Sequence, residues 1–110
     1  MGRYTNPLPH LQFAVLGILG SDRKTGQELR DALRELGVGK GAPAFYRLMG
    51  RMEEGGLVEG TYVQEIVDGQ IYRQRSYQIT AVGRAARDEA SRFQLAIIRR
   101  FGGILADGNA

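Results

Sequence analysis

Positively charged side chains gather in two short stretches of the chain that contain no acidic residue. These cations are Lys40, Arg47 and Arg51 within residues 40–52, and Arg73 and Arg75 within residues 69–79. Such groups bind phosphate oxygens, and an arginine in a major groove can also bind guanine O6 and N7. They are therefore candidates for contact with nucleic acid. The alternatives are solvated arginines on an ordinary amphipathic helix and, in the second stretch, charges that protect an edge strand from aggregation.

The side chains that catalysis or metal binding would need are scarce. The chain has one histidine, His10, and no cysteine, which excludes disulfides and thiolate metal sites. No glycine-rich phosphate motif follows a predicted strand. We therefore expect no enzyme activity, no metal and no cofactor. Glu53 and Glu54 are expected to be solvated acids at a helix end.

The composition is that of one globular domain. The 110 residues are 43% hydrophobic and 25% charged, with a net charge of +3 at pH 7. That charge permits nucleic-acid binding without requiring it. The longest apolar run, residues 13–19, is too short to span a bilayer, and no basic signal-peptide start precedes it. We expect a cytoplasmic protein with no membrane contact.

The first basic stretch falls on a short helix predicted over residues 42–55. Pro43 suits a first helical turn, and Gly55-Gly56 would end the helix. The predicted apolar face consists of Phe45, Leu48, Met49 and Met52, and the opposite face carries Arg47, Gly50, Arg51 and Glu54. A compact helix with an apolar back and an arginine-bearing front, followed by a strand, is typical of a helix presented to a DNA groove.

Another amphipathic helix is predicted just before this one. Thr25 is a suitable N-cap, and Glu28 three residues later completes a capping-box pattern. The helix continues through an apolar face made of Leu29, Ala32, Leu33 and Leu36. The glycine-rich residues 37–41 then lead into the basic helix, which gives the helix-turn-helix order.

Two extended runs, residues 57–67 and 70–79, follow the basic helix. Asp68-Gly69 between them is a strong hairpin signal because both residue types tolerate positive φ. A hairpin in this position is called a wing. We expect Arg73 and Arg75 to flank its tip and to reach a phosphate or the minor groove.

Helices are also predicted at both ends of the chain. The first is expected to begin around residues 7–9 with Asn6 as its cap. It is apolar on nearly every side over residues 11–19, which predicts burial on every side, against the core and a dimer partner. Residues 1–5 and 104–110 are expected to be loose.

The last helix is predicted from its cap, Thr80, to about Phe101, a length of about 30 Å. A stripe of apolar residues at heptad-like spacing consists of Ala86, Ala90, Phe93, Ile97 and Phe101. A helix this long would project beyond so small a domain, which favours dimerisation over packing within one chain. The expected fold is therefore mainly α with a β-hairpin: a winged helix-turn-helix over residues 1–79, then a dimerisation helix and tail over residues 80–110.

Four segments resemble the PadR-like winged-helix transcriptional regulators, in particular the small subfamily with a single C-terminal helix. They are FAVLGILG (13–20), TGQELRDAL (25–33), AFYRLMGRMEEGGLV (44–58) and RSYQITAVGRAA (75–86). The resemblance implies a homodimer, joined through the C-terminal and first helices, that binds double-stranded DNA at a palindromic operator, usually as a repressor. The basic helix would enter the major groove, with the wing along the adjacent backbone.

The resemblance also implies site residues by matching position. Tyr46, Arg47 and Arg51 are the foremost DNA contacts, although Tyr46 could instead be a partly buried bridge between helix and wing. The wider DNA-binding set adds Thr25, Gln27, Lys40, Ala44, Gly50, Arg73 and Arg75. The dimer or ligand interface would comprise Phe13, Leu16, Ala86, Ala90, Phe93, Ile97 and Phe101.

Two positions depart from the family pattern. Ala44 stands where a hydroxyl residue is common, and Gln27 where an aromatic residue is common, which puts the operator sequence in doubt more than the fold. Small members can hold flat aromatic ligands between the C-terminal helices. A small hydrophobic or aromatic effector beside Phe93 and Ile97 is therefore one interpretation, and plain dimer core is the other. The competing function is a winged-helix module that binds another protein and not specific DNA.

Overall fold

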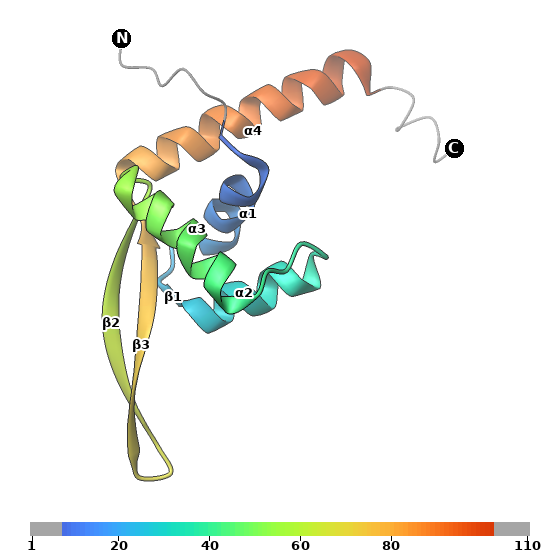
Figure 1. Cartoon of the computed structure of the whole chain (residues 1–110). Helices are drawn as coiled ribbons and strands as arrows, with labels where there is room; N and C mark the ends of the chain where they lie inside the picture. Colours follow the sequence, from blue (N-terminus) through green and yellow to red (C-terminus); the bar gives the residue numbers. More distant parts are fainter. Residues whose placement is uncertain (1–7, 103–110) are drawn as a thin grey trace.

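The computed structural model describes residues 8–102, which form four helices and a small antiparallel sheet (Figure 1). In chain order the elements are α1 (His10–Leu19), β1 (Lys24–Thr25), α2 (Gly26–Glu35), α3 (Ala42–Glu54), β2 (Val58–Val67), β3 (Gln70–Ile79) and α4 (Ala81–Phe101). The predicted class, mainly α with a β-hairpin, is confirmed. The expectations for Asn6 and for the two chain ends lie outside the described residues.

The core lies between α1, α2, α3 and the base of the sheet. Its fully buried side chains include the predicted apolar face of α3. They are joined by residues from α1 and α2 and from the start of β2 and end of β3: Val15, Leu16, Leu19, Leu29, Leu33, Val58, Tyr77 and Ile79. The same burial leaves the opposite face of α3 on the surface.

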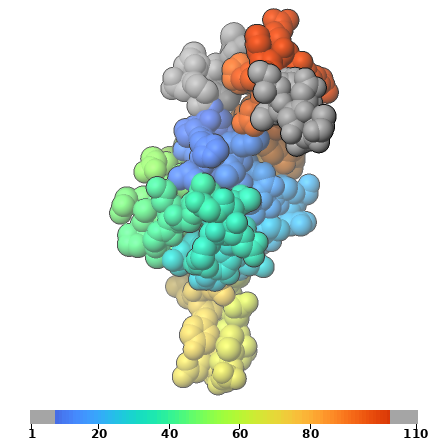
Figure 2. Space-filling view, turned by 90° about the vertical axis from the view of Figure 1, so that its right-hand side faces the viewer, coloured from blue at the N-terminus to red at the C-terminus, as the bar shows by residue number. Residues whose placement is uncertain are grey.

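The hairpin β2–β3, which we call the wing, stands away from this body (Figure 2). Asp68 and Gly69 have φ of 52° and 80°, as a two-residue turn of this kind requires. The resulting register places Tyr62 opposite Arg75 and Gln64 opposite Arg73. The predicted hairpin and its turn are confirmed.

A third strand, β1, escaped prediction because it has two residues. Lys24 and Thr25 pair with Tyr77 and Ser76 of β3, so the strand order is β1-β3-β2. The preceding residue, Arg23, donates hydrogen bonds to Thr61, Ser76 and Gln78 on the wing (3.0, 3.2 and 2.9 Å). This strand and Arg23 anchor the base of the wing to the helical body.

The helix ends agree with the predicted caps, with two corrections, at the start of α1 and at Leu36 after α2. The capping box of α2 is present, with Glu28 N donating to Thr25 Oγ1 (3.1 Å) and Thr25 N to Glu28 Oε1 (2.8 Å). α1 begins at His10 after Pro9, later than expected. At the end of α3, Gly56 adopts the left-handed conformation (φ 75°), whereas Gly55 stays helical. Leu36 lies beyond α2 and is 62% exposed, so it does not extend the apolar face.

α1 and α4 leave apolar surface uncovered. α1 buries Val15, Leu16 and Leu19 in the core, as predicted for one side, and Gly17 on the opposite side is exposed, so burial of that side by a dimer partner stays a prediction. α4 has 21 residues and begins as predicted at Thr80, whose hydroxyl accepts from Gly83 N (2.9 Å). Only its first turns pack on α1 and β3, and the remainder extends past the body (Figure 1).

Candidate nucleic-acid interface

The basic face of the molecule is formed by the exposed side of α3 and the loop before it. Burial of Phe45, Leu48, Met49 and Met52 turns Arg47 and Arg51 outward into solvent, and Lys40 is exposed in the preceding loop. Within residues 8–102, neither of these arginines forms an ion pair. Two cations one helical turn apart on an exposed helix face can reach base edges or phosphates in one groove.

Tyr46 lies beside this face and packs against the start of α2. Its ring meets Phe45 edge to face, with 4.8 Å between centroids, and its side chain remains 41% exposed. A Cβ on Gly26 would overlap the Tyr46 hydroxyl, so the absence of a side chain at Gly26 makes room for the ring. Tyr46 therefore rests on the N-terminal turn of α2 with its side chain partly exposed.

The predicted contacts on α2 already have hydrogen-bond partners within the chain. The Thr25 hydroxyl accepts the capping hydrogen bond from Glu28 N, and Gln27 Nε2 donates to Asp31 Oδ1 (2.9 Å). The bond from Gln27, together with one from Arg34, lowers the pKa of Asp31. Thr25 still has its hydroxyl proton to donate, whereas Gln27 is exposed and would have to exchange its partner.

Two small residues of α3 adjoin the arginines. Ala44 is partly buried, and its methyl group supplies no hydrogen bond. No heavy atom lies within 4 Å of the position that a Cβ would take on Gly50. Gly50 therefore opens the surface of α3 between Arg47 and Arg51, where a partner can approach the backbone.

The tip of the wing carries no arginine, contrary to the prediction. The residues next to the Asp68-Gly69 turn are apolar and exposed: Ile66 (76%), Val67 (47%), Ile71 (66%) and Tyr72 (47%). Because the register pairs Arg73 with Gln64 and Arg75 with Tyr62, these arginines lie along the shaft between the tip and α3. The turn chemistry was predicted correctly, but the distance from the turn to each arginine was underestimated.

Arg75 is engaged by an acid of α3. Its Nη2 atom lies 2.6 Å from Glu53 Oε2, and both side chains are only 27% exposed. The hydrogen bond that Arg75 donates to Glu53 raises the pKa of Arg75 above its usual range. The expectation that Glu53 is a solvated helix-end acid is therefore wrong, since it joins the last turn of α3 to the wing.

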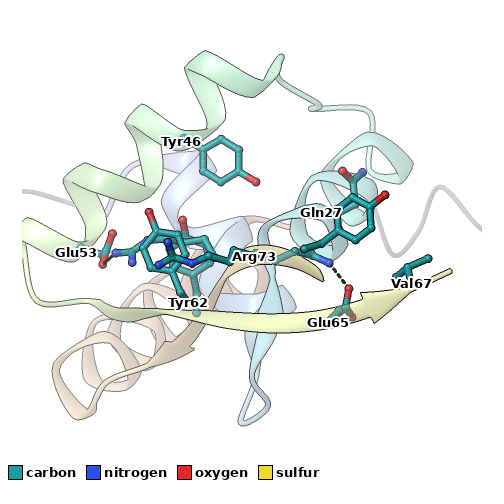
Figure 3. A pocket seen from close by; sticks show the side chains of 11 residues that line it. Gln27, Tyr46, Glu53, Tyr62, Glu65, Val67 and Arg73 are labelled. Atoms are coloured by element: carbon teal, nitrogen blue, oxygen red, sulfur yellow. Dashed lines mark hydrogen bonds and ion pairs between the residues drawn. The ribbon is translucent and has the colours of Figure 1, made fainter. Parts of the chain in front are cut away.

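Arg73 has a different environment. Its guanidinium carbon lies 4.4 Å from the centroid of the Tyr62 ring, and that of Arg75 lies 4.9 Å from the same centroid. Figure 3 shows Tyr62 and Arg73 from the wing, with Tyr46 of α3 opposite them across an open groove. The groove has a volume of about 780 Å³ and also includes Gln27 and Glu53 in its lining. It separates the basic face from the wing.

Burial of Tyr77 at the base of the wing gives a stability prediction. Tyr77 is 1% exposed, and burial raises its pKa to about 12, against about 10 in an unfolded chain. Because the folded state favours the neutral phenol, Tyr77 makes its full contribution to the free energy of unfolding below pH 10. This contribution is lost between pH 10 and 12, by up to about 2 to 3 kcal/mol.

Urea unfolding at pH 8, 10 and 11 measures this loss. Tyr77→Phe, which keeps the ring and has no titrating hydroxyl, should show a smaller decline than the wild type. A parallel decline in both proteins would show that Tyr77 does not contribute.

The predicted interface residues divide into buried and exposed groups. Leu16 and Ala86 are buried in the chain's own core, and Phe13 and Ala90 are partly buried. Phe93 (67% exposed), Ile97 (45%) and Phe101 (72%) face solvent on the projecting half of α4, as do Leu95 (47%) and Ile98 (52%). Several large apolar side chains exposed together on one helix of a small domain are typical of an interaction site.

The described residues also bear on metal binding and membrane spanning. Residues 8–102 contain no group of three His, Cys, Asp or Glu side chains that could hold a metal ion. No helix in this described part is long and apolar enough to cross a membrane. Sequence reasoning missed Glu53, Tyr62, Gly60 and Arg23, although the two-residue turn alone implies that Tyr62 faces Arg75.

Comparisons with known proteins agree with this geometry. The family model described as the transcriptional regulator PadR-like family matches residues 15–89. No curated protein matches the chain significantly.

Solved structures share the fold at low sequence identity. A PadR-like transcriptional regulator from Bacillus cereus is 23% identical with a TM-score of 0.68, over 86% of this chain and 90% of that one. A PadR family transcriptional regulator from Eggerthella lenta is 23% identical with a TM-score of 0.64, over 86% and 80%. Bacillus subtilis PadR, solved in complex with operator DNA, is 21% identical with a TM-score of 0.56, over 80% of this chain and 48% of that one.

Proposed function

This chain belongs to the PadR-like family of transcriptional regulators, and we propose that it acts as a sequence-specific DNA-binding repressor. The observation that carries the proposal is the pair Arg47 and Arg51. Both are exposed, and neither forms an ion pair within residues 8–102, on a helix whose other face is packed into the core. The structure of Bacillus subtilis PadR with operator DNA supports a DNA partner for the same fold.

In the proposed complex, α3 enters the major groove. Arg47 and Arg51 bind guanine edges or phosphates there, and Lys40 binds a phosphate at the start of the helix. The hydroxyl groups of Tyr46 and Thr25 donate to DNA phosphates beside α2, because Thr25 caps the N-terminus of this helix and Tyr46 packs against its first residue, Gly26. Gln27 and Ala44 complete the surface without adding charge.

We propose a homodimer in which residues 80–110 join two DNA-binding units of residues 1–79. The support is the apolar surface on α4 around Phe93, Ile97 and Phe101, which is left exposed in the described part of the chain, together with the half-buried Phe13 of α1. A two-fold dimer presents two copies of α3, so its operator would be palindromic. A small hydrophobic or aromatic effector that stacks on Phe93 beside Ile97 would release the DNA by changing this interface.

The wing tip favours a second candidate function, binding of another protein. Ile66 and Ile71 form an exposed apolar pair, and Glu65 and Asp68 place negative charge beside them. This surface would repel phosphates and suits a protein partner. The basic face of α3 is not interrupted in this way, and so DNA binding remains the main proposal.

Enrichment from a random duplex library tests the proposed function. The purified full chain is incubated with the library, and bound duplexes are amplified and sequenced. Two half-sites in inverted orientation, about 10 base pairs apart from centre to centre, are the expected result. Absence of any enriched motif would contradict sequence-specific binding and favour the protein-binding alternative.

Substitution of Gly50 should have opposite effects on folding and DNA binding. Glycine inside a helix costs about 0.5 to 1 kcal/mol relative to alanine, and the added methyl meets no atom of the chain. Gly50→Ala should therefore raise the melting temperature by a few degrees. It should also weaken operator binding, because the methyl lies between Arg47 and Arg51. Calorimetry and anisotropy measure the two effects.

Gly17→Ala is the matched control for Gly50→Ala. Gly17 is an exposed helical glycine of α1 and also has no neighbour within 4 Å. This change should stabilise the fold and leave operator affinity unaltered, and sedimentation velocity checks that the dimer is kept, because Gly17 lies one turn from Phe13. If Gly50→Ala binds the operator as tightly as the wild type, the backbone near Gly50 does not approach DNA.

A further inference from the structure

The two arginines of the wing have different partners: Arg75 forms an ion pair with Glu53, whereas Arg73 lies over the ring of Tyr62. This difference suggests different roles in DNA binding. We propose that Glu53 and Tyr62 are positioning residues for DNA binding: Glu53 withdraws Arg75 from DNA, and Tyr62 holds Arg73 ready as the wing's phosphate-binding cation. This inference rests on the proposed function. It assigns roles to two residues outside the basic face and separates Arg73 from Arg75.

The withdrawal of Arg75 follows from its ion pair. Nη2 of Arg75 lies 2.6 Å from Glu53 Oε2, and the partly buried position of both side chains shields the pair from water and salt. Rotating Arg75 toward a phosphate would leave Glu53 as an unpaired acid beside a polyanion. The pair is therefore electrically neutral toward DNA, and Arg75 adds nothing to the attraction.

The lack of a side chain at Gly60 leaves room for this ion pair. A Cβ on Gly60 would lie 2.5 Å from Glu53 Oε2 and 2.9 Å from Arg75 Nη2. Gly60 is not among the residues with positive φ, so no turn requires a glycine here. The absent side chain instead provides the space in which Glu53 of α3 meets Arg75 of β3.

Tyr62 lies close to both cations and is not part of the core. It is 59% exposed, opposite Arg75 in the register, and one diagonal step from Arg73. Both guanidinium groups lie within 5 Å of the centroid of its ring (4.4 and 4.9 Å), a distance at which the π-face attracts a cation. Because Glu53 holds Arg75 in place, the contact with Arg75 also restricts the Tyr62 ring. The ring then gives Arg73 a defined position on the wing.

Arg73 keeps its charge available. Among residues 8–102 it forms no ion pair, and the nearest acid along the opposite strand, Glu65, instead accepts a hydrogen bond from Gln74 (2.6 Å). Arg73 lies on the groove between the wing and α3, where a DNA backbone next to the recognition helix would run (Figure 3). A preorganised arginine loses less side-chain entropy when it binds.

The salt dependence of operator binding tests this assignment. Each phosphate contact contributes about 0.9 to the slope of log affinity against log salt, and a homodimer carries two wings. Arg73→Ala should therefore reduce the slope by about 1.8 and weaken binding roughly 30-fold at 0.15 M salt. Tyr62→Leu should also reduce operator affinity, but it should have little further effect when Arg73→Ala is already present. Tyr62→Phe should bind like the wild type because it keeps the ring.

Glu53→Gln tests the withdrawal of Arg75. Loss of the acid releases Arg75, so the slope should steepen by up to about 1.8, and affinity for a scrambled duplex should rise. The matched controls are Tyr72→Leu, another exposed wing tyrosine, and Glu54→Gln, the neighbouring exposed acid. The effects of both controls should be small: Tyr72→Leu should preserve the slope, and Glu54→Gln should steepen it less than Glu53→Gln.

The outcomes separate this inference from the function on which it depends. If the wild type binds its operator but Tyr62→Leu has the operator affinity of Tyr72→Leu, and Glu53→Gln has the salt slope of Glu54→Gln, the inference is overturned and the function stands. If the wild type binds no duplex, both fail. An upfield ring-current shift of the Arg73 side-chain N–H, kept in Tyr62→Phe and lost in Tyr62→Leu, reports the stacking independently of DNA.

Discussion

The double variant Arg47→Ala, Arg51→Ala should lose at least about 10³-fold in operator affinity and retain its fold. Both side chains are exposed on α3 and form no ion pair in residues 8–102, so their removal breaks no ion pair of the described chain. Each specific arginine contact is worth about 1 to 3 kcal/mol, and a dimer loses four of them. Anisotropy titration of a labelled operator, with circular dichroism to monitor the fold, measures the effect.

The charge-matched control is Arg84→Ala, Arg92→Ala, which removes two exposed arginines of α4 that, like Arg47 and Arg51, form no ion pair in residues 8–102. This variant should bind within a few-fold of the wild type, because neither residue lies on the basic face. If the control loses as much affinity as the α3 variant, binding depends on total charge alone. The assignment of α3 to the major groove would then be wrong.

The second large effect is expected at α4, where Phe93→Glu, Ile97→Glu should convert the dimer to monomers. These side chains are 67% and 45% exposed in the single chain, so the monomer should keep its fold. Burying a phenylalanine or isoleucine contributes about 1.5 to 3 kcal/mol, and each would be replaced by a charge in both subunits. Sedimentation velocity measures the mass, and operator affinity should fall about 10²- to 10⁴-fold because linked half-sites bind together.

Gln94→Glu is the control for this prediction, since it adds a negative charge at an exposed position between the two altered residues. It should remain a dimer. If the double glutamate variant instead unfolds, the stripe belongs to the chain's own core. If it stays dimeric and folded, another surface joins the subunits.

The elements of the fold were predictable where short-range patterns decide them. Apolar residues at steps of three and four defined α3, and the Thr25–Glu28 capping box and the Asp68-Gly69 turn placed two boundaries. Each of these signals acts within a few residues of chain, where backbone geometry restricts the possible structures. The same local signals located Arg47 and Arg51 on the exposed face.

Long-range contacts could not be predicted in this way. Glu53 and Arg75 are separated by 22 positions, and their meeting depends on the angle between α3 and the wing. The tight turn implies that Tyr62 faces Arg75, but no local pattern shows that Glu53 reaches the same place. β1 was missed for a related reason, because two residues become a strand only when β3 is beside them.

Misjudged burial explains the remaining errors. Leu36 fits the spacing of the apolar face of α2, yet it follows the last residue of the helix and is exposed. The stripe on α4 mixes residues with different roles, since Ala86 is buried in the domain and Phe93 is exposed. Helical periodicity indicates which residues share a face but not what covers that face.

The central claim is that two copies of α3 read a specific DNA sequence, and one titration tests it most directly. The enriched duplex and a scrambled duplex of the same composition are titrated with the full chain by fluorescence anisotropy, from 50 to 300 mM salt. We predict binding of one dimer to the enriched duplex, at least about 10³-fold tighter than to the scrambled control, with a steep salt dependence for both. Equal and weak binding to the two duplexes would contradict the claim.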